Sequence, residues 1–554
     1  MTRRERWTLI LLWLALGLLP LLMRPLWEPD EGRYAEISRE MLATGDWLTP
    51  RLNGVLYFEK PPLQYWLSAL SMKAFGVNGA AARLPLALAS GLMIWAAWRL
   101  AKRLGAREPL WAPFMAATGL FAFLIGQLLT LDALFSGFLV AAIAAFVEAV
   151  VRRREGQPAL AWTLSSFLFL AGAMLTKGLA EVVLTGGILG LSLVFAWRDS
   201  ALRRAVLRTA LDPLGWLLYL ALVVPWFWAV NRANPGHAEF FFIHEHFKRF
   251  LTHEHARQGS DNWALDKLYF VGVLAVGLLP WLSAVLVGLK RSWTFLKGRG
   301  PQGQDHLAGW IVGITAMAFL WPLAFFSLSG SKLPPYILPV IAPLAALACT
   351  FEREGEERVA LRRLGKELIL LGGVFLLATV LFRKDLEGLG WMLALGATFA
   401  GLGLWAHHPR GLTASRLVAA LGAGLWLLVF AAQAAAGPGK SVADLVRAAP
   451  RNAQWISYGT YFQGLPFYAH TRVVVVAGTG ELAYGRDRLQ DAERWFQEDP
   501  AALGTMADRL KAESPTVPVL VMAKASNWQR LDAAEKARWE EVARNPAAVV
   551  ARRR

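Results

Sequence analysis

The side chains that could do chemistry in this chain are charged residues at the ends of long apolar runs. Asp30 and Glu31 directly follow the first apolar run, and Glu59 and Lys60 close the same polar stretch. A carboxylate can act as a general base, and a lysine stabilises the negative charge that develops on a departing phosphate. Both clusters are expected at one boundary between lipid and water, which is where the phosphate of a lipid lies.

Three further charges stand alone between apolar runs. Asp132 is the one charged residue between Pro109 and Val147, while Lys177 lies in LTKG and Lys332 in SGSKLPPY. A charge inside a membrane or at its edge is costly and usually marks a functional site. A single lysine there can instead extend its ammonium to the interface. The gathering of all these charges on one face favours a site.

A third polar cluster lies in the loop at 231–263, where His244, His246, Lys248 and Arg249 stand beside several phenylalanines. His244 and Lys248 are one helical turn apart, so both can point at the same boundary. Imidazole and carboxylate groups also bind zinc, which makes this cluster a candidate metal site. An interfacial amphipathic helix explains the same residues without a metal, and we keep both interpretations.

The elements that must position these residues are membrane spans. The chain has 554 residues, of which 55% are hydrophobic, and a mean hydropathy of +0.38, which is typical of a polytopic membrane protein. Its net charge of +17 comes from Lys and Arg in short loops between apolar runs, a pattern that favours membrane orientation over nucleic-acid binding. The single cysteine, Cys349, excludes disulfides within the chain and cysteine-based metal sites.

Thirteen apolar segments are long enough for a hydrocarbon core about 30 Å thick. These segments are 7–23, 80–98, 109–126, 132–150, 159–175, 179–197, 213–230, 265–289, 307–327, 334–350, 367–382, 389–406 and 414–434. Basic residues cluster in the loops after even-numbered segments, so we expect the N-terminus in the cytoplasm and the C-terminus outside. The first segment lacks a small-residue cleavage site, and we interpret it as an uncleaved span.

The polar stretch after the first span is expected to form a helix on the membrane surface. Ile37 and Met41 recur at helical spacing, while Arg33, Glu36 and Glu40 occupy the other side. This pattern predicts an amphipathic helix that lies along the boundary and does not cross the membrane.

The character of the chain changes after residues 437–439, which read Gly-Pro-Gly. Short β-like runs at 453–458, 472–477 and 517–522 alternate with helical stretches at 490–503 and 527–542, which indicates a small soluble α/β domain. The glycines of AGTGELAYG lack the spacing of a nucleotide-binding motif, so we interpret them as a turn and expect no nucleotide cofactor. The expected organisation is a membrane domain over 1–438, with amphipathic outer loops at 24–78 and 231–263, and an α/β domain over 439–554.

Several motifs together resemble one known family. They are PDEGRYAE after the first span, YFEKPPLQYW at the end of the first outer loop, the lone Asp132, LTKG, SKLPPYILP, and YFQGLPFYAHTR near the C-terminus. These motifs resemble the lipid A aminoarabinose transferases, which are GT-C glycosyltransferases related to protein O-mannosyltransferases, and the resemblance covers the whole chain. It implies a mostly α-helical GT-C fold with about thirteen transmembrane helices and a small periplasmic α/β domain.

The resemblance also implies a reaction and its partners. Such enzymes take a sugar from an undecaprenyl-phosphate carrier and transfer it at the outer face of the bacterial inner membrane. The expected sugar is 4-amino-4-deoxy-L-arabinose and the expected acceptor is a phosphate of lipid A, with the bilayer as environment, no nucleic-acid partner and a monomeric protein. Another GT-C transferase, acting on protein or on a different envelope polymer, is the nearest alternative. A membrane transporter is more remote, because its charges would lie near the bilayer midplane.

The resemblance assigns roles to the charged residues found above. Asp30 matches the catalytic carboxylate, and Asp132 is the second catalytic candidate. The expected contacts to the carrier phosphate and the cavity are Arg33, Tyr57, Lys60, Lys177, Arg249, Lys332 and Tyr336. His244 lies where a metal ligand is expected beside Glu59, which implies a structural zinc. In that loop Lys248 could replace Arg249, and His246 could replace His244.

The role of Asp30 depends on the acceptor. A hydroxyl acceptor needs a general base, whereas a phosphate is already nucleophilic, so that Asp30 would orient it or hold the amine of the sugar. Asp30 could also act only as the N-cap of the helix that follows, with Arg33 and Tyr34 in its first turn.

Overall fold

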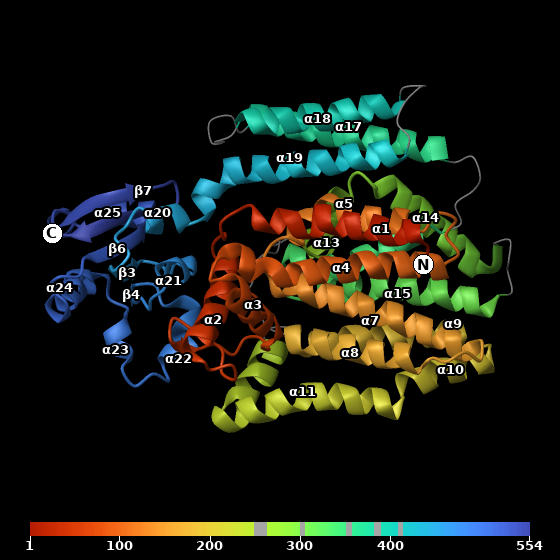
Figure 1. The fold of residues 1–554 in the computed structure, drawn as a ribbon, viewed down its shortest axis with the longest axis horizontal. Helices are drawn as coiled ribbons and strands as arrows, with labels where there is room; N and C mark the ends of the chain where they lie inside the picture. Colours follow the sequence, from red (N-terminus) through yellow and green to blue (C-terminus); the bar gives the residue numbers. More distant parts are fainter. Residues whose placement is uncertain (249–262, 300–304, 351–356, 382–388, 408–413) are drawn as a thin grey trace.

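The computed structural model describes residues 1–248, 263–299, 305–350, 357–381, 389–407 and 414–554. A bundle of long helices carries, at one end, a region built around a six-stranded sheet (Figure 1). The N-terminus lies near the opposite end of the bundle (Figure 1).

Most of the chain before residue 440 is helical. Its elements are α1 (Arg3–Leu12), η1 (Trp13–Leu18), η2 (Leu19–Leu22), α2 (Asp30–Thr44), β1 (Arg51–Leu52), β2 (Val55–Leu56), α3 (Leu63–Phe75), α4 (Gly79–Arg103), α5 (Trp111–Thr118), α6 (Leu120–Ile125), α7 (Leu131–Arg154), α8 (Leu160–Lys177), α9 (Ala180–Ala196), α10 (Ser200–Ala210), α11 (Pro213–Ala233), η3 (Glu239–Lys248), α13 (Trp263–Gly277), α14 (Leu282–Thr294), η4 (Phe295–Arg299), α15 (His306–Leu328), η5 (Pro334–Val340), α16 (Ile341–Ala348), α17 (Glu357–Leu381), α18 (Leu389–His407) and α19 (Ala414–Lys440).

Within the described residues, eight helices are long and apolar enough to cross a membrane, or nine if one sharply bent pair counts as a span. Three shorter apolar helices, at 180–196, 334–348 and 419–434, add to them. The fold is therefore that of a polytopic membrane protein, as the sequence predicts, while the number of thirteen spans stays a prediction.

Two of the predicted spans are interrupted, and the two breaks contact each other. The segment 109–126 forms the short helices α5 and α6, and the segment 265–289 forms α13 and α14, which are bent by 117°. The backbone N–H of Leu120 donates to the carbonyl of Leu279 at 3.0 Å. A continuous helix is disfavoured at this point, because Pro280 lacks the N–H that would donate within it.

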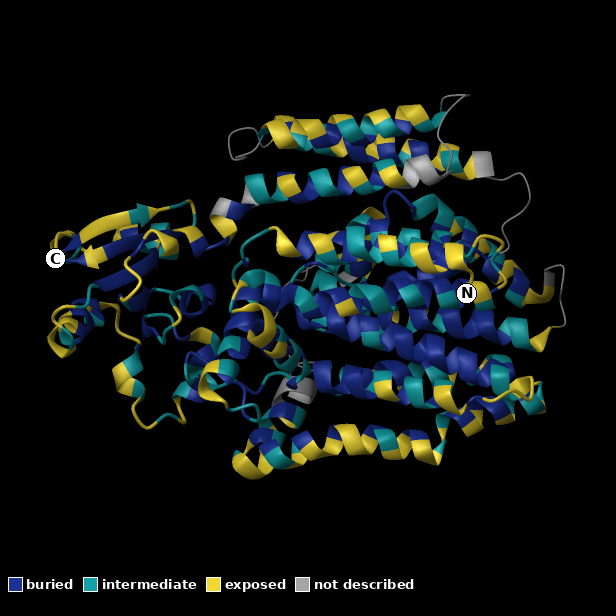
Figure 2. Cartoon of the chain, in the orientation of Figure 1, coloured by how far each residue is buried: buried dark blue, intermediate teal, exposed yellow. Residues whose placement is uncertain are grey.

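Helix α7 forms the centre of the bundle. Almost all of its residues from Leu131 to Val151 are buried, and Figure 2 shows the helix almost entirely in the colour of buried residues. Helix α4 approaches α7 closely at Gly137, which faces Ala89 of α4. Any larger residue at position 137 would clash, because its Cβ would lie 2.7 Å from the carbonyl oxygen of Ala89. The packing of α7 fixes the position of Asp132, which lies in its first turn.

Helix α2 has no exposed polar face, unlike the predicted amphipathic helix, whereas its position along the boundary between lipid and water stays a prediction. Its residues from Glu31 to Ser38 are all buried, the polar ones included. The reason is that helix α21 (Gly464–Ala469), far along the sequence, covers it. A Cβ on Gly32 would lie only 2.5 Å from the backbone nitrogen of Gly464. Figure 1 shows α2 between the bundle and the sheet region.

The loop after α2 contains an antiparallel hairpin of β1 and β2. Its turn is Asn53-Gly54, with φ of +54° and +77°, the left-handed conformations that this residue pair adopts readily in hairpins. The Asn53 amide donates to the carbonyl of Val473 at 3.0 Å, and its Oδ1 accepts from the backbone N–H of Val473 at 2.9 Å. These bonds fasten the outer loop to the sheet region.

The C-terminal region contains a mixed sheet in the order β5-β4-β3-β6-β8-β7. Strands β5, β4, β3 and β6 pair in parallel, and β8 pairs antiparallel with both β6 and β7. Its elements are α20 (Ala443–Arg447), β3 (Gln454–Tyr458), α21, β4 (Val474–Val476), η6 (Gly480–Leu482), α22 (Ala483–Arg486), α23 (Ala492–Trp495), β5 (Phe496–Gln497), η7 (Pro500–Ala502), α24 (Leu503–Glu513), β6 (Val519–Lys524), α25 (Ala525–Arg530), α26 (Ala533–Lys536), β7 (Trp539–Arg544) and β8 (Ala548–Arg553).

The three predicted β-like runs correspond to β3, β4 and β6, and those predictions are confirmed. The predicted helix at 490–503 is wrong, because that segment holds only the short elements α23, β5 and η7. Pro500 starts a new turn there, which a continuous helix would not tolerate in its interior. The stretch at 527–542 is helical only in part, since it ends in the edge strand β7.

Candidate active site

Three carboxylates act electrostatically on the phenol of Tyr34, a buried residue of α2. Burial raises the pKa of Tyr34 well above its usual value, and Arg33 partly offsets this increase. The charges of Asp30, Asp132 and Glu59 each raise the same pKa further. Because such interactions weaken with distance, Asp30, Asp132 and Glu59 all lie near Tyr34, although they come from three separate parts of the chain.

Asp30 stands at the start of α2 with 48% of its side chain exposed. Nη1 of Arg33, one turn along the helix, lies 3.2 Å from Oδ1 of Asp30. Arg33 itself is buried, and its Nε and Nη2 lie 3.0 and 2.9 Å from Oε1 of Glu481. Pro29 occupies the N-cap position and no side chain caps the helix, so the alternative in which Asp30 only caps α2 is wrong.

Tyr57, Glu59 and Lys60 lie in the segment between β2 and α3. Tyr57 is buried, and burial followed by the charge of Glu59 raises its pKa, while Arg33 lowers it. Its hydroxyl has no hydrogen-bond partner among the described residues. The ammonium of Lys60 donates to the carbonyl of Glu59 at 2.8 Å, and its side chain is partly exposed. A phenol hydroxyl and an ammonium are both donors that suit phosphate oxygens.

Asp132 and Lys177 join the ends of two helices. Asp132 lies in the first turn of α7 and Lys177 is the last residue of α8, and the ammonium of Lys177 donates to Oδ1 of Asp132. The same ammonium lies 4.4 Å from the ring centroid of Tyr336 in η5. The structure thus brings together three of the predicted site residues, which come from α7, α8 and η5.

Lys332 is placed differently from the other predicted cations. Its side chain is fully buried, and its ammonium lies 2.8 Å from Oδ2 of Asp266 and 2.6 Å from the carbonyl of Ser329. This ion pair joins the start of α13 to the segment before η5. Phosphate binding by Lys332 stays a prediction.

Two predicted residues cannot be placed in the site. Arg249 lies outside the described residues, and the side chain of His244 lies outside the described part as well. In the part of the chain that is described, no three or more His, Cys, Asp or Glu side chains gather in a way that could hold a metal ion. Glu59 is therefore the one described member of the predicted zinc pair, and the zinc site stays a prediction.

Glu31, next to Asp30, has a structural environment that the sequence did not indicate. Its carboxylate accepts hydrogen bonds from both Arg83, at 2.8 Å, and Arg24, at 2.5 and 2.9 Å. It also accepts from the backbone N–H of Leu129 at 2.8 Å. Burial alone would raise the pKa of Glu31, but the two guanidinium groups outweigh it and hold that pKa well below its usual value. Glu31 thereby ties α2 to α4 and to the segment that leads into Asp132.

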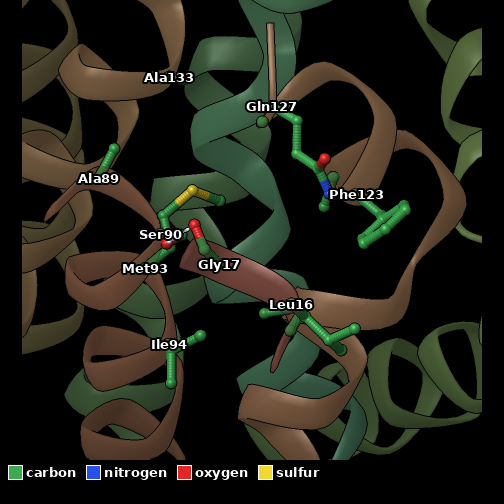
Figure 3. A pocket seen from close by; sticks show the side chains of 13 residues that line it. Leu16, Gly17, Ala89, Ser90, Met93, Ile94, Phe123, Gln127 and Ala133 are labelled. Carbon is green, nitrogen blue, oxygen red and sulfur yellow. Dashed lines mark hydrogen bonds between the residues drawn. The ribbon is translucent and has the colours of Figure 1, made fainter. Parts of the chain in front are cut away.

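A narrow crevice lies beside the N-terminal end of α7, between η1, α4, α5 and α6 (Figure 3). Most of its lining is apolar, and the residues labelled in Figure 3 are Leu16, Gly17, Ala89, Ser90, Met93, Ile94, Phe123, Gln127 and Ala133. The backbone carbonyl of Gln127 accepts from Arg24 at 3.0 Å. Walls of this composition suit a hydrocarbon chain better than a sugar.

Comparison with known proteins identifies the family. A family model described as dolichyl-phosphate-mannose-protein mannosyltransferase matches residues 59–228. The undecaprenyl phosphate-alpha-4-amino-4-deoxy-L-arabinose arabinosyl transferase of Edwardsiella ictaluri is 34% identical over 394 residues, which are 69% of this chain and 66% of the relative. The chain belongs to the aminoarabinose transferase family. A second member, from Aeromonas hydrophila, is 34% identical over 365 residues, which are 64% of this chain and 61% of that relative.

A solved structure extends the match over the whole chain. The crystal structure of ArnT from Cupriavidus metallidurans bound to undecaprenyl phosphate matches with a TM-score of 0.77 and 26% identity, covering 100% of this chain and 98% of that one. The apo structure of the same protein matches with a TM-score of 0.75. The predicted GT-C fold of the aminoarabinose transferases is thereby confirmed, together with a C-terminal region that contains β-strands.

Proposed function

We propose that this chain is an integral-membrane glycosyltransferase that moves 4-amino-4-deoxy-L-arabinose from an undecaprenyl-phosphate carrier to a phosphate of lipid A. The observation that supports it most is the meeting of Asp132, Lys177 and Tyr336, in which the ammonium of Lys177 pairs with Asp132 and lies 4.4 Å from the Tyr336 ring centroid. The charges of Asp30, Glu59 and Asp132 also act on the nearby phenol of Tyr34. The names of the relatives support the sugar and the carrier. The acceptor rests on the sequence motifs.

The departure of a lipid phosphate develops negative charge that the site must stabilise. Lys60 and Lys177 would supply fixed cations at a poorly hydrated boundary, where they stabilise such charge better than water does. The buried hydroxyl of Tyr57 would donate to the same phosphate. The bond between the anomeric carbon and the phosphate oxygen would break while an acceptor oxygen bonds to the opposite face of that carbon, which inverts its configuration.

The role of Asp30 follows from its exposure and its charge partner. Its half-exposed carboxylate can contact a substrate, while Arg33 holds its other side. A phosphate of lipid A is already anionic and nucleophilic, so Asp30 would not be needed to remove a proton from it. We infer that Asp30 instead orients the amine-bearing sugar, to which an anionic carboxylate binds favourably.

The proposed setting is the bacterial inner membrane, with the N-terminus in the cytoplasm and the sheet region in the periplasm. The basic loops between the spans support this orientation. The partners would be the carrier-linked donor, lipid A and the bilayer, and the protein would act as a monomer. A structural zinc held by Glu59 and His244 is part of the proposal, but no step of the reaction depends on it.

A second candidate function is supported by one observation. The match of residues 59–228 to the protein mannosyltransferase model favours a transferase that takes another polyprenyl-phosphate sugar or acts on protein. Donor chemistry and leaving group would be the same in both cases. The two candidates therefore differ in the sugar and in the acceptor.

Mass spectrometry of lipid A separates the two candidates. The chain would be expressed in cells that make the carrier-linked aminoarabinose but lack a transferase for it, with an empty vector as control. The proposal predicts lipid A that carries one or two added aminoarabinose residues only when the chain is present. Unchanged lipid A from membranes that contain the folded protein would contradict the proposed acceptor, and a newly glycosylated protein in the same cells would favour the alternative.

A further inference from the structure

The sheet region contributes a charged residue directly behind the catalytic carboxylate. Glu481 is 17% exposed, and its Oε1 accepts from Nε and Nη2 of Arg33 at 3.0 and 2.9 Å. The remaining terminal nitrogen of Arg33, Nη1, lies 3.2 Å from Oδ1 of Asp30. One guanidinium therefore bridges a carboxylate of the membrane region and a carboxylate of the sheet region.

The backbone around Glu481 explains why it stands there. It lies in η6, within the turn that follows the parallel strand β4, and Ala477 and Gly480 in that turn have φ of +57° and +50°. The carboxyl ends of parallel strands are where sheets of this kind present residues to a ligand. Here that edge is directed at α2 and not at open solvent.

Neighbouring residues of the sheet region hold the Glu481 carboxylate in place. The side-chain amide of Gln463 donates to Oε1 of Glu481. The backbone N–H groups of Gln463 and Gly464 donate to the carboxylate of Glu28 at 2.8 and 2.6 Å, which fixes this loop against the start of α2. Glu481 is thus supported from its own domain while it binds Arg33 of the other.

The orientation of Asp30 depends on how the guanidinium of Arg33 is held. Arg33 is buried and has 6% of its side chain exposed, so it cannot find solvent partners if Glu481 loses its charge. A planar guanidinium held at two of its nitrogens presents the third in a defined direction. With that restraint removed, Arg33 would turn toward Asp30, its other anionic partner, and would draw that carboxylate away from a substrate.

We propose that Glu481 is a positioning residue for the transferase reaction, which acts through Arg33 to hold the Asp30 carboxylate in its productive orientation. The inference rests on the proposed function. It assigns to the sheet region a part in the chemistry of the membrane site, in addition to covering α2. It also predicts that the effect of Glu481 on the reaction is transmitted through Arg33.

The test compares variants of the full-length protein in a transfer assay with undecaprenyl-phosphate-linked aminoarabinose and lipid A. Glu481→Gln should lower kcat about 10- to 100-fold, the scale of one lost charge-assisted bond, while KM for the donor changes by less than about threefold. Glu481→Asp keeps the charge and should recover most of the lost rate. A wild type that transfers nothing would contradict the proposed function, whereas a fully active Glu481→Gln would overturn this inference alone.

A matched control separates positioning from docking of the sheet region. Asn53→Gly removes the two bonds to Val473 but keeps the left-handed turn, which glycine adopts readily. It should lower the melting temperature and leave kcat unchanged. If Asn53→Gly lowers kcat as much as Glu481→Gln does, the role of Glu481 is docking and the inference is wrong.

A double-mutant cycle keeps the inference testable even if Glu481→Gln is less stable. Residues that act through one another give effects that do not add. In an Arg33→Lys background, Glu481→Gln should change kcat by less than about twofold, because the bridge is already broken. If the two changes multiply to their full combined loss, Glu481 does not act through Arg33.

Discussion

The ammonium of Lys177 lies against the Tyr336 ring, 4.4 Å from its centroid, while it forms an ion pair with Asp132. Asp132 stands at the N-terminal end of α7 and Lys177 at the C-terminal end of α8, so each charge also has the sign that its helix end favours. An ammonium has three N–H donors, so Lys177 can keep its bond to Asp132 while it donates to a phosphate oxygen.

The first prediction concerns this pair. Lys177→Ala should lower transfer by at least ~100-fold, because the leaving phosphate loses a fixed cation in a poorly hydrated site. The rate would be measured with purified protein in vesicles that contain the donor and lipid A. Lys290→Ala, which removes an exposed lysine from α14, is the control and should transfer at the wild-type rate. A Lys177→Ala variant with more than about half of the wild-type rate would show that Lys177 does not stabilise the leaving phosphate.

The second prediction concerns carrier binding. Lys60→Ala should reduce the amount of undecaprenyl phosphate that copurifies with the protein, because a desolvated phosphate loses a charged partner. Lipid extraction and mass spectrometry measure this amount. Lys73→Ala on α3, an exposed lysine, should retain as much carrier as the wild type. Equal retention by Lys60→Ala would place the phosphate elsewhere.

The third prediction concerns the stability of the site. Glu31→Gln leaves the buried guanidinium groups of Arg24 and Arg83 without a negative partner and should destabilise the protein by about 3–5 kcal/mol. Thermal unfolding in detergent measures the change. Glu513→Gln removes a carboxylate from a surface ion pair and should leave the melting temperature unchanged. A Glu31→Gln protein as stable as the wild type would contradict the structural role assigned to Glu31.

The fourth prediction concerns pH. Burial raises the pKa of Glu36 on α2 from its usual 4.5 to about 8, although hydrogen bonds from Arg39 oppose the increase. A carboxyl group with a raised pKa in the folded protein keeps its proton when the unfolded chain has already lost it. Stability should therefore fall as pH rises from about 4.5 to about 8, by up to about 1.4 kcal/mol per pH unit. Melting temperatures across this range test the prediction.

Glu36→Gln is the variant that isolates this contribution, since glutamine resembles the protonated carboxyl group. The fall in melting temperature between pH 5 and pH 8 should be smaller in the variant than in the wild type. Burial also raises the pKa of Glu28 to about 7, so that part of the fall should persist in Glu36→Gln. An identical pH dependence in the two proteins would show that Glu36 does not bind the proton.

Much of the candidate site could be predicted from local sequence, because it stands at the ends of apolar helices. Asp132 and Lys177 are recognisable as isolated charges next to long apolar runs, and a charge in such a place has few structural explanations. The same logic is less informative for Lys332. Its partner Asp266 lies within a predicted span, and only the bend between α13 and α14 gives that segment its actual shape.

Other parts of the site depend on contacts between distant segments. Asp30 and Glu31 are adjacent acidic residues, and nothing local distinguishes the half-exposed one from the one that binds Arg24 and Arg83. The pattern of α2 predicts a surface helix because the segment that buries it comes more than 400 residues later. Glu481 lies in a glycine-rich turn after a strand, where the glycines gave a signal for a turn but none for an ion pair with Arg33.

The measurement that tests the central claim most directly is transfer by purified Asp30→Asn protein. The variant keeps the size of the side chain and removes its charge. It leaves the capping of α2 unchanged, because Pro29 occupies the N-cap position. Wild-type protein in vesicles with undecaprenyl-phosphate-linked aminoarabinose should produce aminoarabinose-modified lipid A, detected by mass spectrometry. We predict that Asp30→Asn inserts stably, retains the carrier lipid and transfers at least ~100-fold more slowly. A rate close to that of the wild type would contradict the assignment of Asp30 as the catalytic carboxylate.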